Sequence, residues 1–365
     1  MRPTRLEVNL TRLKHNIEAI RAHVAPAMVM PMVKANAYGH GVDGVAPFLE
    51  PYVDYFGVAI LEEGIHLRQL GIKKPILVAG GTLPEQVPFF ADYDLTLTGS
   101  SVELLDAAEE YSSSTGRQIK THLKIDTGME RVGVRDYEAG AFIDHTLRLK
   151  HVHIEGIYTH LANSELAEGE YSRMQLERFQ AVLQIYEKRS EKVPAIRHVN
   201  NSGGIINLPD ANFDMVRPGV LFYGVYPDRD SNRPLTVMPA LRWISQVVYS
   251  KVVKPGRPVS YGSLWQARAE TRVVTIPCGY ADGYFRRMTN QAAVIIQGRK
   301  FPQVGRICMD QFMVDTAEEP VRIGEEVILL GDGITAYDLA EWAGTNEYEV
   351  LTNISGRVPR VYITE

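Results

Sequence analysis

Lys34 directly follows the apolar run Met28–Val33 in the stretch MVMPMVKANAYGHG. An ammonium group at the end of such a run is costly to bury unless it is paired or loses its proton. A lysine at a strand end is most often a surface residue whose charged tip reaches water. A lysine held in a partly desolvated pocket instead has a lowered pKa, and its neutral amine can form a Schiff base with an aldehyde.

Other polar side chains end or follow later apolar runs, which predicts that they gather with Lys34. Each alone has an ordinary structural interpretation, such as a hydrogen-bonded histidine or an arginine that bridges two loops. Their occurrence after so many different strands favours a functional site. The residues are Lys124, Asp126, Tyr158, His160, His198, Asn201, Ser202 and Arg217.

Pyridoxal 5'-phosphate is the commonest aldehyde cofactor that binds a lysine, and it needs a phosphate site and a partner for its ring nitrogen. The segments NNSGG, residues 200–204, and RPGV, residues 217–220, offer small residues and backbone N–H groups for a phosphate. Arg217 or an acidic residue could serve the ring nitrogen.

The elements that would position these groups repeat as a strand followed by a helix. Apolar runs begin near residues 28, 55, 75, 95, 121, 153, 196 and 215, and amphipathic helical segments lie between them. Roughly eight such units in about 200 residues are typical of a parallel (β/α)₈ TIM-type barrel, in which functional groups lie at the carboxyl ends of the strands. A doubly wound open sheet is the alternative, but no GxGxxG turn follows any of these strands.

The pattern changes beyond Pro234, where short β-rich runs are separated by glycine and proline. We therefore expect two domains, a barrel at residues 9–233 and a smaller all-β domain at residues 234–365 that also takes the N-terminal strand, residues 1–8. The polar, proline-rich segment YPDRDSNRPLTVMP is the expected boundary.

Composition favours a small-molecule partner. The chain has 365 residues, is 45% hydrophobic and 23% charged, and carries 39 Lys and Arg against 44 Asp and Glu, a net charge of −5. Such a balance gives no basic surface for nucleic acid or an anionic membrane. Two cysteines give no disulfide framework, and neither a signal peptide nor a membrane-spanning apolar segment is present in the sequence, so a cytoplasmic location is expected.

Longer motifs then make the sequence resemble the bacterial alanine racemases, which are fold-type III pyridoxal-phosphate enzymes. VKANAYGHG at residues 33–41 is similar to the family's cofactor-lysine motif over its whole length. Further similar motifs run along nearly the entire chain: LKIDTGMERVG, YTH, NNS, MVRPG, SYG, GYADGY, GRICMDQ and RVPR. The family fold is an N-terminal (β/α)₈ barrel with a C-terminal β domain.

The resemblance implies roles for individual residues. Lys34 would bind the cofactor covalently, and racemisation would need a base on each face of the substrate, namely Lys34 and Tyr261 of the partner subunit. The implied cofactor-binding residues are Lys34, Tyr38, His160, Asn201, Ser202, Arg217, Gly219 and Val220, with Arg217 at the pyridine nitrogen. The implied substrate-binding residues are Arg131, Met309 and Asp310, and those lining the channel through which substrate enters are Tyr284 and Arg306.

The same resemblance implies a homodimer with its active site at the interface, alanine as the substrate and D-alanine supply for peptidoglycan as the role. Lys124 matches a position where the lysine is often carbamylated, which would give Arg131 a negative partner. A decarboxylase of the same fold type and a pyridoxal-phosphate carrier are the alternatives. The C-terminal cysteine and acidic motifs of the decarboxylases are not found in this sequence, and a carrier would need no β domain.

Two departures from the family pattern carry expectations. Glu130 replaces a glycine in DTGMER, so a positive φ there would be strained and would favour a slightly different loop. Gly356 stands in SGRVPR where some members have a tyrosine, which should widen the substrate pocket and allow some turnover of serine.

Overall fold

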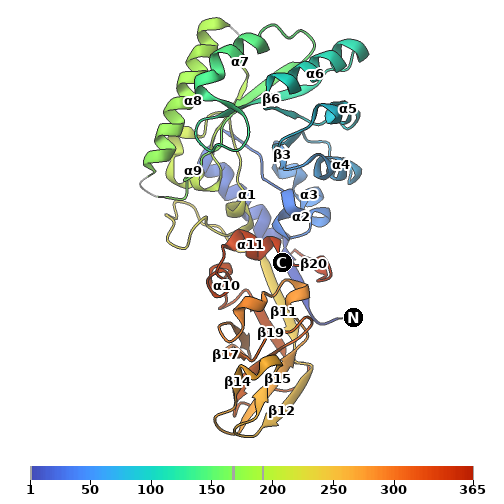
Figure 1. Ribbon diagram of the computed structural model, residues 1–365, viewed down its shortest axis with the longest axis vertical. Coiled ribbons are helices and arrows are strands. Elements are labelled where there is room, and N and C mark those ends of the chain that lie inside the picture. Colours follow the sequence, from blue (N-terminus) through green and yellow to red (C-terminus); the bar gives the residue numbers. More distant parts are fainter. Residues whose placement is uncertain (1, 167–168, 191–192, 365) are drawn as a thin grey trace. The chain divides into compact units, whose positions relative to one another are not determined.

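The structure is a computed structural model that describes residues 2–166, 169–190 and 193–364, and its chain forms two compact units (Figure 1). We call one the barrel unit, which consists of Leu13–Ala37 and Val42–Met238. The other, the β unit, consists of the chain up to Arg12, Tyr38–Gly41 and the chain from Pro239 onward. The division falls at Pro239, whereas the sequence placed it at residue 234. Among the described residues, no helix is both long and apolar enough to cross a membrane.

In the part of the chain that the structure describes, eight parallel strands form the centre of the barrel unit. Hydrogen-bonded ladders join them in the order β5-β6-β8-β9-β10-β2 and, separately, β3-β4. Parallel bridges between Met32 and Gly57 and between Leu77 and Thr96 connect the two sets at both ends. The pairing therefore returns to its starting strand, and the predicted parallel (β/α)₈ architecture is confirmed. The strands are β2 (Met28–Val29), β3 (Phe56–Val58), β4 (Ile76–Val78), β5 (Leu97–Gly99), β6 (Lys120–Asp126), β8 (His153–Tyr158), β9 (Ile196–His198) and β10 (Met215–Val216).

Helices alternate with these strands along the chain. They are α1 (Leu10–Val24), α2 (Lys34–Tyr38), α3 (Val42–Leu49), α4 (Leu61–Gln69), α5 (Val87–Asp92), α6 (Val102–Thr115), α7 (Ala139–Thr146), α8 (Glu170–Arg189) and α9 (Ser202–Asn207). A short strand, β7 (Val134–Arg135), pairs with β6 beside the barrel.

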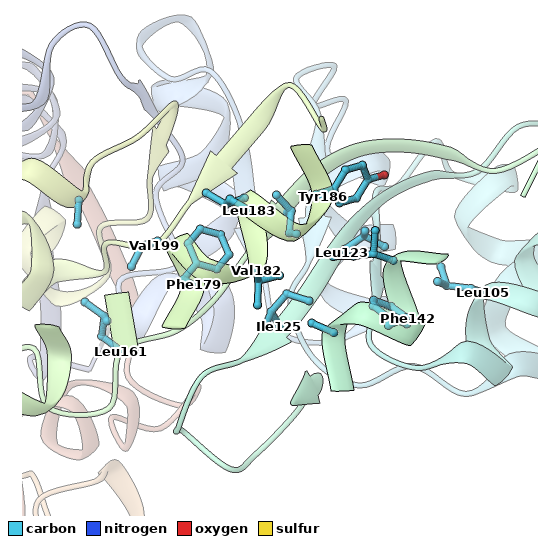
Figure 2. Packing of buried hydrophobic residues seen from close by; sticks show 14 of the residues in the cluster. Leu105, Leu123, Ile125, Phe142, Leu161, Phe179, Val182, Leu183, Tyr186 and Val199 are labelled. Atoms are coloured by element: carbon cyan, nitrogen blue, oxygen red, sulfur yellow. The ribbon is translucent and has the colours of Figure 1, made fainter. Parts of the chain in front are cut away.

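The helices are held on the strands by a continuous apolar core, part of which Figure 2 shows. Helix α8 buries Phe179, Val182, Leu183 and Tyr186, whose spacing of three and four residues places them on one face of the helix. Strand β6 is buried over six of its seven residues, as a parallel strand covered on both sides must be. The core thus fixes the direction of β6, which ends in the polar residues of the candidate site.

One predicted strand is shorter than expected. The last of the apolar runs, residues 215–224, predicts a single strand, but β10 ends at Val216 and residues Val220–Tyr223 form a 3₁₀ helix, η5. Pro218 lacks a backbone N–H and cannot continue the ladder. The turn at Gly219 therefore separates the strand from η5.

The β unit is built on a nine-stranded sheet, counted over the described residues, in the order β12-β15-β18-β17-β16-β19-β11-β1-β20. Strand β1 (Arg5–Asn9) lies between β11 and the C-terminal β20. The other strands are β11 (Leu241–Gln246), β12 (Tyr249–Val253), β15 (Thr271–Ile276), β16 (Ala293–Ile296), β17 (Arg299–Val304), β18 (Phe312–Ala317), β19 (Glu326–Leu330) and β20 (Arg360–Ile363), with a separate hairpin of β13 (Pro258–Val259) and β14 (Trp265–Gln266).

Two helices of the β unit were not predicted: α10 (Ala336–Ala343) and α11 (Glu347–Thr352). Thr335 and Asn346 cap their first turns with side-chain oxygens, and Gly344 ends α10 in the left-handed conformation. These capping residues were the sequence signal that could have identified both helices.

Candidate active site

Lys34 lies five residues beyond β2, just after the isolated bridge at Met32, and begins an unusual turn. The four residues that follow it, Ala35 to Tyr38, have φ angles of 52, 54, 53 and 49°. A left-handed conformation costs an L-residue roughly 1–2 kcal/mol, so four in succession must be held by their surroundings. Sequence patterns did not predict this turn.

Two side chains hold the start of this turn. Glu63, in the first turn of α4, accepts a hydrogen bond at 2.7 Å from the backbone N–H of Ala35. The side-chain oxygen of Asn36 accepts one at 2.8 Å from the N–H of Val42. The chain therefore leaves Lys34 along a fixed path, which fixes the base of the lysine side chain.

The environment of Lys34 favours its neutral form. Burial lowers the pKa of this amine, the positive charge of Arg131 lowers it further, and Glu63 partly opposes the shift. A neutral amine is the form that can act as a nucleophile or take up a proton. The sequence prediction for Lys34 thus has an electrostatic basis.

Arg131 is presented by a loop wrapped around one carboxylate. Asp126, the last residue of β6, accepts N–H bonds from residues 128, 129 and 130 on Oδ1 and from Arg131 on Oδ2, at 2.8–3.1 Å. Burial would raise the pKa of Asp126, but the backbone bonds lower it below its usual value. Glu130 has a φ of 51°, so it takes the strained conformation that the sequence expectation associated with glycine. The hydrogen bonds to Asp126 hold the loop in this conformation. Residue 130 therefore keeps a left-handed backbone although it is a glutamate where the family pattern has glycine.

Lys124 is almost fully buried two residues before Asp126. Its Nζ donates to the carbonyl of Ile125 at 3.1 Å and lies 5.2 Å from the ring centre of Tyr158. Burial, followed by repulsion from Arg217, lowers the pKa of Lys124 to about 7. The amine is therefore largely neutral in mildly alkaline solution.

Arg217 follows β10 and is also buried. Its guanidinium donates at 2.7 and 2.8 Å to the carbonyls of Thr159 and Val199, at 2.8 Å to His198 Nδ1 and at 3.3 Å to His160 Nδ1. Burial lowers the pKa of Arg217 to about 10, so it remains charged at neutral pH. Burial and the surrounding cations lower the pKa of His160 well below its usual value, which leaves this imidazole neutral.

The predicted phosphate residues lie where β9 and β10 give way to α9 and η5. Ser202 Oγ accepts the N–H groups of Gly219 at 2.9 Å and Leu221 at 3.2 Å, and its hydroxyl hydrogen remains able to donate. The Gly219 N–H is thus used within the protein, whereas the sequence assigned it to phosphate. Asn201 caps α9 by accepting from the N–H of Gly204, and Val220 is buried at the start of η5.

This donor set fits pyridoxal 5'-phosphate. Lys34 supplies a partly buried amine with a lowered pKa, the Ser202 hydroxyl supplies a neutral donor suited to a phosphate, and Arg217 supplies a buried charge. All of these groups belong to the barrel unit.

A second set of predicted residues lies in the β unit. Tyr261, Arg306, Met309 and Asp310 line a pocket of about 690 Å³, and Tyr261 is 70% exposed. Tyr261 lies in a strained segment, because Ser260 has a φ of 69° and Ser263 a φ of 51°. Ser260 Oγ anchors this segment by donating at 2.6 Å to the carbonyl of Arg306.

The prediction that Tyr284 lines the substrate channel is wrong. Tyr284 is fully buried, stacked on Phe312 at a centroid distance of 4.6 Å and packed edge-on against Trp243. Of the two tyrosines in GYADGY, the sequence prediction named only Tyr284. The structure places Tyr280 in the pocket beside Tyr261.

Tyr38 is buried in the β unit, where its ring lies 6.3 Å from that of Tyr348. Its assignment to the cofactor stays a prediction. Tyr158, which the sequence placed among the polar residues at strand ends but gave no role of its own, is central to the barrel site. Its ring stacks on His198 at 4.5 Å, and the guanidinium carbon of Arg217 lies 5.2 Å from its centre.

Fold and site together define a two-domain enzyme with a lysine at the mouth of a parallel barrel. The alanine racemase N-terminal domain model matches residues 8–227, and the alanine racemase C-terminal domain model matches residues 240–362. The chain therefore belongs to the alanine racemase family. The match to both family domains also excludes the carrier and decarboxylase alternatives raised from the sequence.

Individual relatives agree over the whole length. An alanine racemase from Carboxydothermus hydrogenoformans is 44% identical, with 100% of each chain covered. A solved alanine racemase from Clostridium difficile 630 is 37% identical with a TM-score of 0.93, covering 100% of this chain and 97% of the other. A solved Bartonella henselae alanine racemase with covalently bound pyridoxal phosphate is 28% identical, has a TM-score of 0.91 and covers 100% of both chains.

Proposed function

We propose that this racemase interconverts L-alanine and D-alanine with pyridoxal 5'-phosphate and two bases, Lys34 of one chain and Tyr261 of a second copy. The observation that carries the proposal is the partly buried Lys34 at the barrel mouth, whose pKa is lowered by burial and by Arg131. The Bartonella relative supports the choice of cofactor. Alanine as the substrate follows from the family to which the chain belongs.

Bound to Lys34, pyridoxal 5'-phosphate supplies an electron-withdrawing group that makes the Cα hydrogen of the amino acid acidic. Ser202 would bind its phosphate, and Arg217 would face its ring nitrogen. Arg217 is charged and donor-only, so it does not hand a proton to that nitrogen. Arg131 would bind the substrate carboxylate by charge and hydrogen bonds.

Racemisation needs a proton to leave one face of Cα and another to arrive on the opposite face. Lys34 Nζ, whose lowered pKa favours the neutral amine, can take or return a proton on its own face. Tyr261 Oη would serve the other face from a second copy of the chain. Two observations support a role for a second copy. Tyr261 is exposed, and it lines one pocket of the β unit together with Met309 and Asp310.

Exchange of Tyr261 for phenylalanine tests the two-base mechanism. The Tyr261→Phe variant should retain the visible absorption of the bound cofactor while racemisation of L-alanine falls by several orders of magnitude. Retained racemisation would exclude Tyr261 as a base. The matched control is Tyr249→Phe, because Tyr249 is exposed and lies outside this pocket. It should change neither the absorption of the bound cofactor nor the rate of racemisation.

Serine turnover is proposed as a side activity. A Cβ added at Gly356 would meet no other atom within 4 Å, so there is open space at this position, where the family resemblance expects a tyrosine in some members. D-alanine supply for peptidoglycan and a cytoplasmic location remain predictions from the family resemblance and the sequence.

A further inference from the structure

A chain of hydrogen bonds leads from Arg217 away from the site into the barrel interior. Arg217 Nη1 donates to His198 Nδ1 at 2.8 Å, and His198 Nε2 lies 2.9 Å from His122 Nδ1. His122 Nε2 lies 3.3 Å from Glu155 Oε2, which also accepts at 2.6 Å from the hydroxyl of Tyr55. Both imidazoles are fully buried, and the Glu155 side chain is 24% exposed.

The groups at the two ends of this series of hydrogen bonds determine which nitrogen of each imidazole carries the proton. A guanidinium only donates, so His198 Nδ1 must accept and the proton of this neutral ring lies on Nε2. His198 Nε2 then donates to His122 Nδ1, which places the His122 proton on Nε2. His122 in turn donates to the Glu155 carboxylate, which only accepts. Burial lowers the pKa of both histidines, which agrees with two neutral rings.

The backbone is adapted to this arrangement. Strand β8 carries a bulge, because Thr121 pairs with Ile154 whereas the next residue, His122, pairs with Gly156. Glu155 is the extra residue, and a bulge is a device that redirects a side chain. Gly156 is needed beside it, since a Cβ there would lie 2.7 Å from Cγ and Nδ1 of His122.

We propose that Glu155 is a positioning residue for Arg217, acting through His122 and His198. Its carboxylate fixes both tautomers, so that His198 presents an unprotonated Nδ1 to the guanidinium. Without an acceptor at residue 155, His122 could carry its proton on Nδ1, and His198 would then present an N–H group to Arg217. The inference rests on the proposed function only in that Arg217 faces the cofactor.

The test uses three variants of the full-length chain: Glu155→Leu, Glu155→Gln and, as a matched control, Glu109→Gln. In the Glu155→Gln variant the amide oxygen can still accept from His122, whereas the leucine side chain of Glu155→Leu cannot. Glu109 also accepts a hydrogen bond from a histidine, His151, within the barrel unit, but it does not belong to the series of hydrogen bonds that leads to Arg217. The ¹⁵N chemical shifts of labelled histidines report the tautomers with and without added pyridoxal 5'-phosphate, and signals are assigned with His122→Gln and His198→Gln.

Wild type, Glu155→Gln and Glu109→Gln should show the Nε2-protonated form at both histidines, and Glu155→Leu should change both. We expect Glu155→Leu to lower kcat roughly tenfold while KM stays within about twofold of the wild-type value. The Glu155→Gln variant should keep most of the wild-type kcat. The leucine effect should largely vanish in an Arg217→Lys background, because coupled residues are not additive.

An Nδ1-protonated His198 in the wild type would overturn the proposal, even if the leucine variant failed to fold. Unchanged tautomers in Glu155→Leu, or an equal loss of kcat in the Arg217→Lys background, would also overturn it. A wild-type protein without racemase activity would instead refute the proposed function, and the histidine shifts would still decide the positioning role.

Discussion

Lys124 Nζ lies 5.2 Å from the ring centre of Tyr158, and its pKa is lowered to about 7 by burial followed by repulsion from Arg217. The folded-state pKa is below the unfolded one, so the unmodified amine destabilises the fold fully below pH 7. This penalty disappears as the pH rises towards about 10.4. A modification that removes the positive charge would relieve it at all of these pH values.

We therefore predict that Lys124 reacts with carbon dioxide. The neutral Nζ attacks the carbon atom of carbon dioxide; as the N–C bond forms, one C=O π pair moves to oxygen and the nitrogen releases one proton to solvent, giving a carbamate. With ¹³C-labelled bicarbonate at pH 8, a carbamate signal should appear in the NMR spectrum and should weaken at pH 6. Lys124→Arg should abolish it, whereas Lys120→Arg, on the same strand but exposed, should not. Absence of the signal at pH 8 would contradict the prediction.

Glu130 provides a stability prediction, because its φ of 51° suits glycine better than glutamate. Glu130→Gly should raise the free energy of unfolding by about 1 kcal/mol, since the lost ion pair with Arg135 is exposed and contributes little. Glu138, with a φ of −100°, is the control, and Glu138→Gly should lower stability by about 0.5–1 kcal/mol. Denaturant unfolding measures both, and a destabilised Glu130→Gly would argue against strain at this position.

Gly305 should control the position of Tyr261. Its φ is 71°, and a Cβ there would lie 2.5 Å from the carbonyl oxygen of Val259, next to Ser260. Gly305→Ala should lower kcat for L-alanine at least about tenfold, because the segment carrying Tyr261 must move. Gly256 has a φ of 78° and open space around its Cβ, so Gly256→Ala should cost about 1 kcal/mol of stability and leave kcat unchanged. Equal kcat values for the two variants would show that the clash does not reach Tyr261.

Gly356 should set the preference between alanine and serine. Gly356→Tyr should reduce kcat/KM for serine relative to alanine by about tenfold or more, because filling the open space penalises the larger side chain. Gly356→Ala, which adds one methyl group, should change the ratio much less. Equal ratios in wild type and Gly356→Tyr would show that the position does not contact the substrate side chain.

The sequence predicted the barrel because its strands are short apolar runs with helices between them, a signal that does not depend on tertiary detail. Lys34, Arg131, Lys124 and Arg217 were found by their place after strands and by motif, and the structure brings them into one electrostatic environment. The division at Pro239 differs by a few residues, as expected where a boundary lies in a polar linker.

Other features could not be predicted because they depend on tertiary contacts. The left-handed turn after Lys34 contains three residues with ordinary helical or strand preferences, and it is held by Glu63 from another helix. The β8 bulge at Glu155 appears only when its pairing with β6 is known. Tyr280 and Tyr284 differ by four residues in one motif, and only packing against Trp243 and Phe312 identifies Tyr284 as a core residue.

The central claim is that Lys34 of one chain and Tyr261 of another complete one active site, and mixing two inactive variants tests it most directly. Lys34→Ala and Tyr261→Phe chains are unfolded together, refolded as a mixture and assayed for racemisation of L-alanine. In half of the randomly formed dimers, one of two sites would combine Lys34 with Tyr261, so activity should recover to about a quarter of wild type. Activity no higher than that of the separate variants, with mixed dimers demonstrated by mass, would contradict the account.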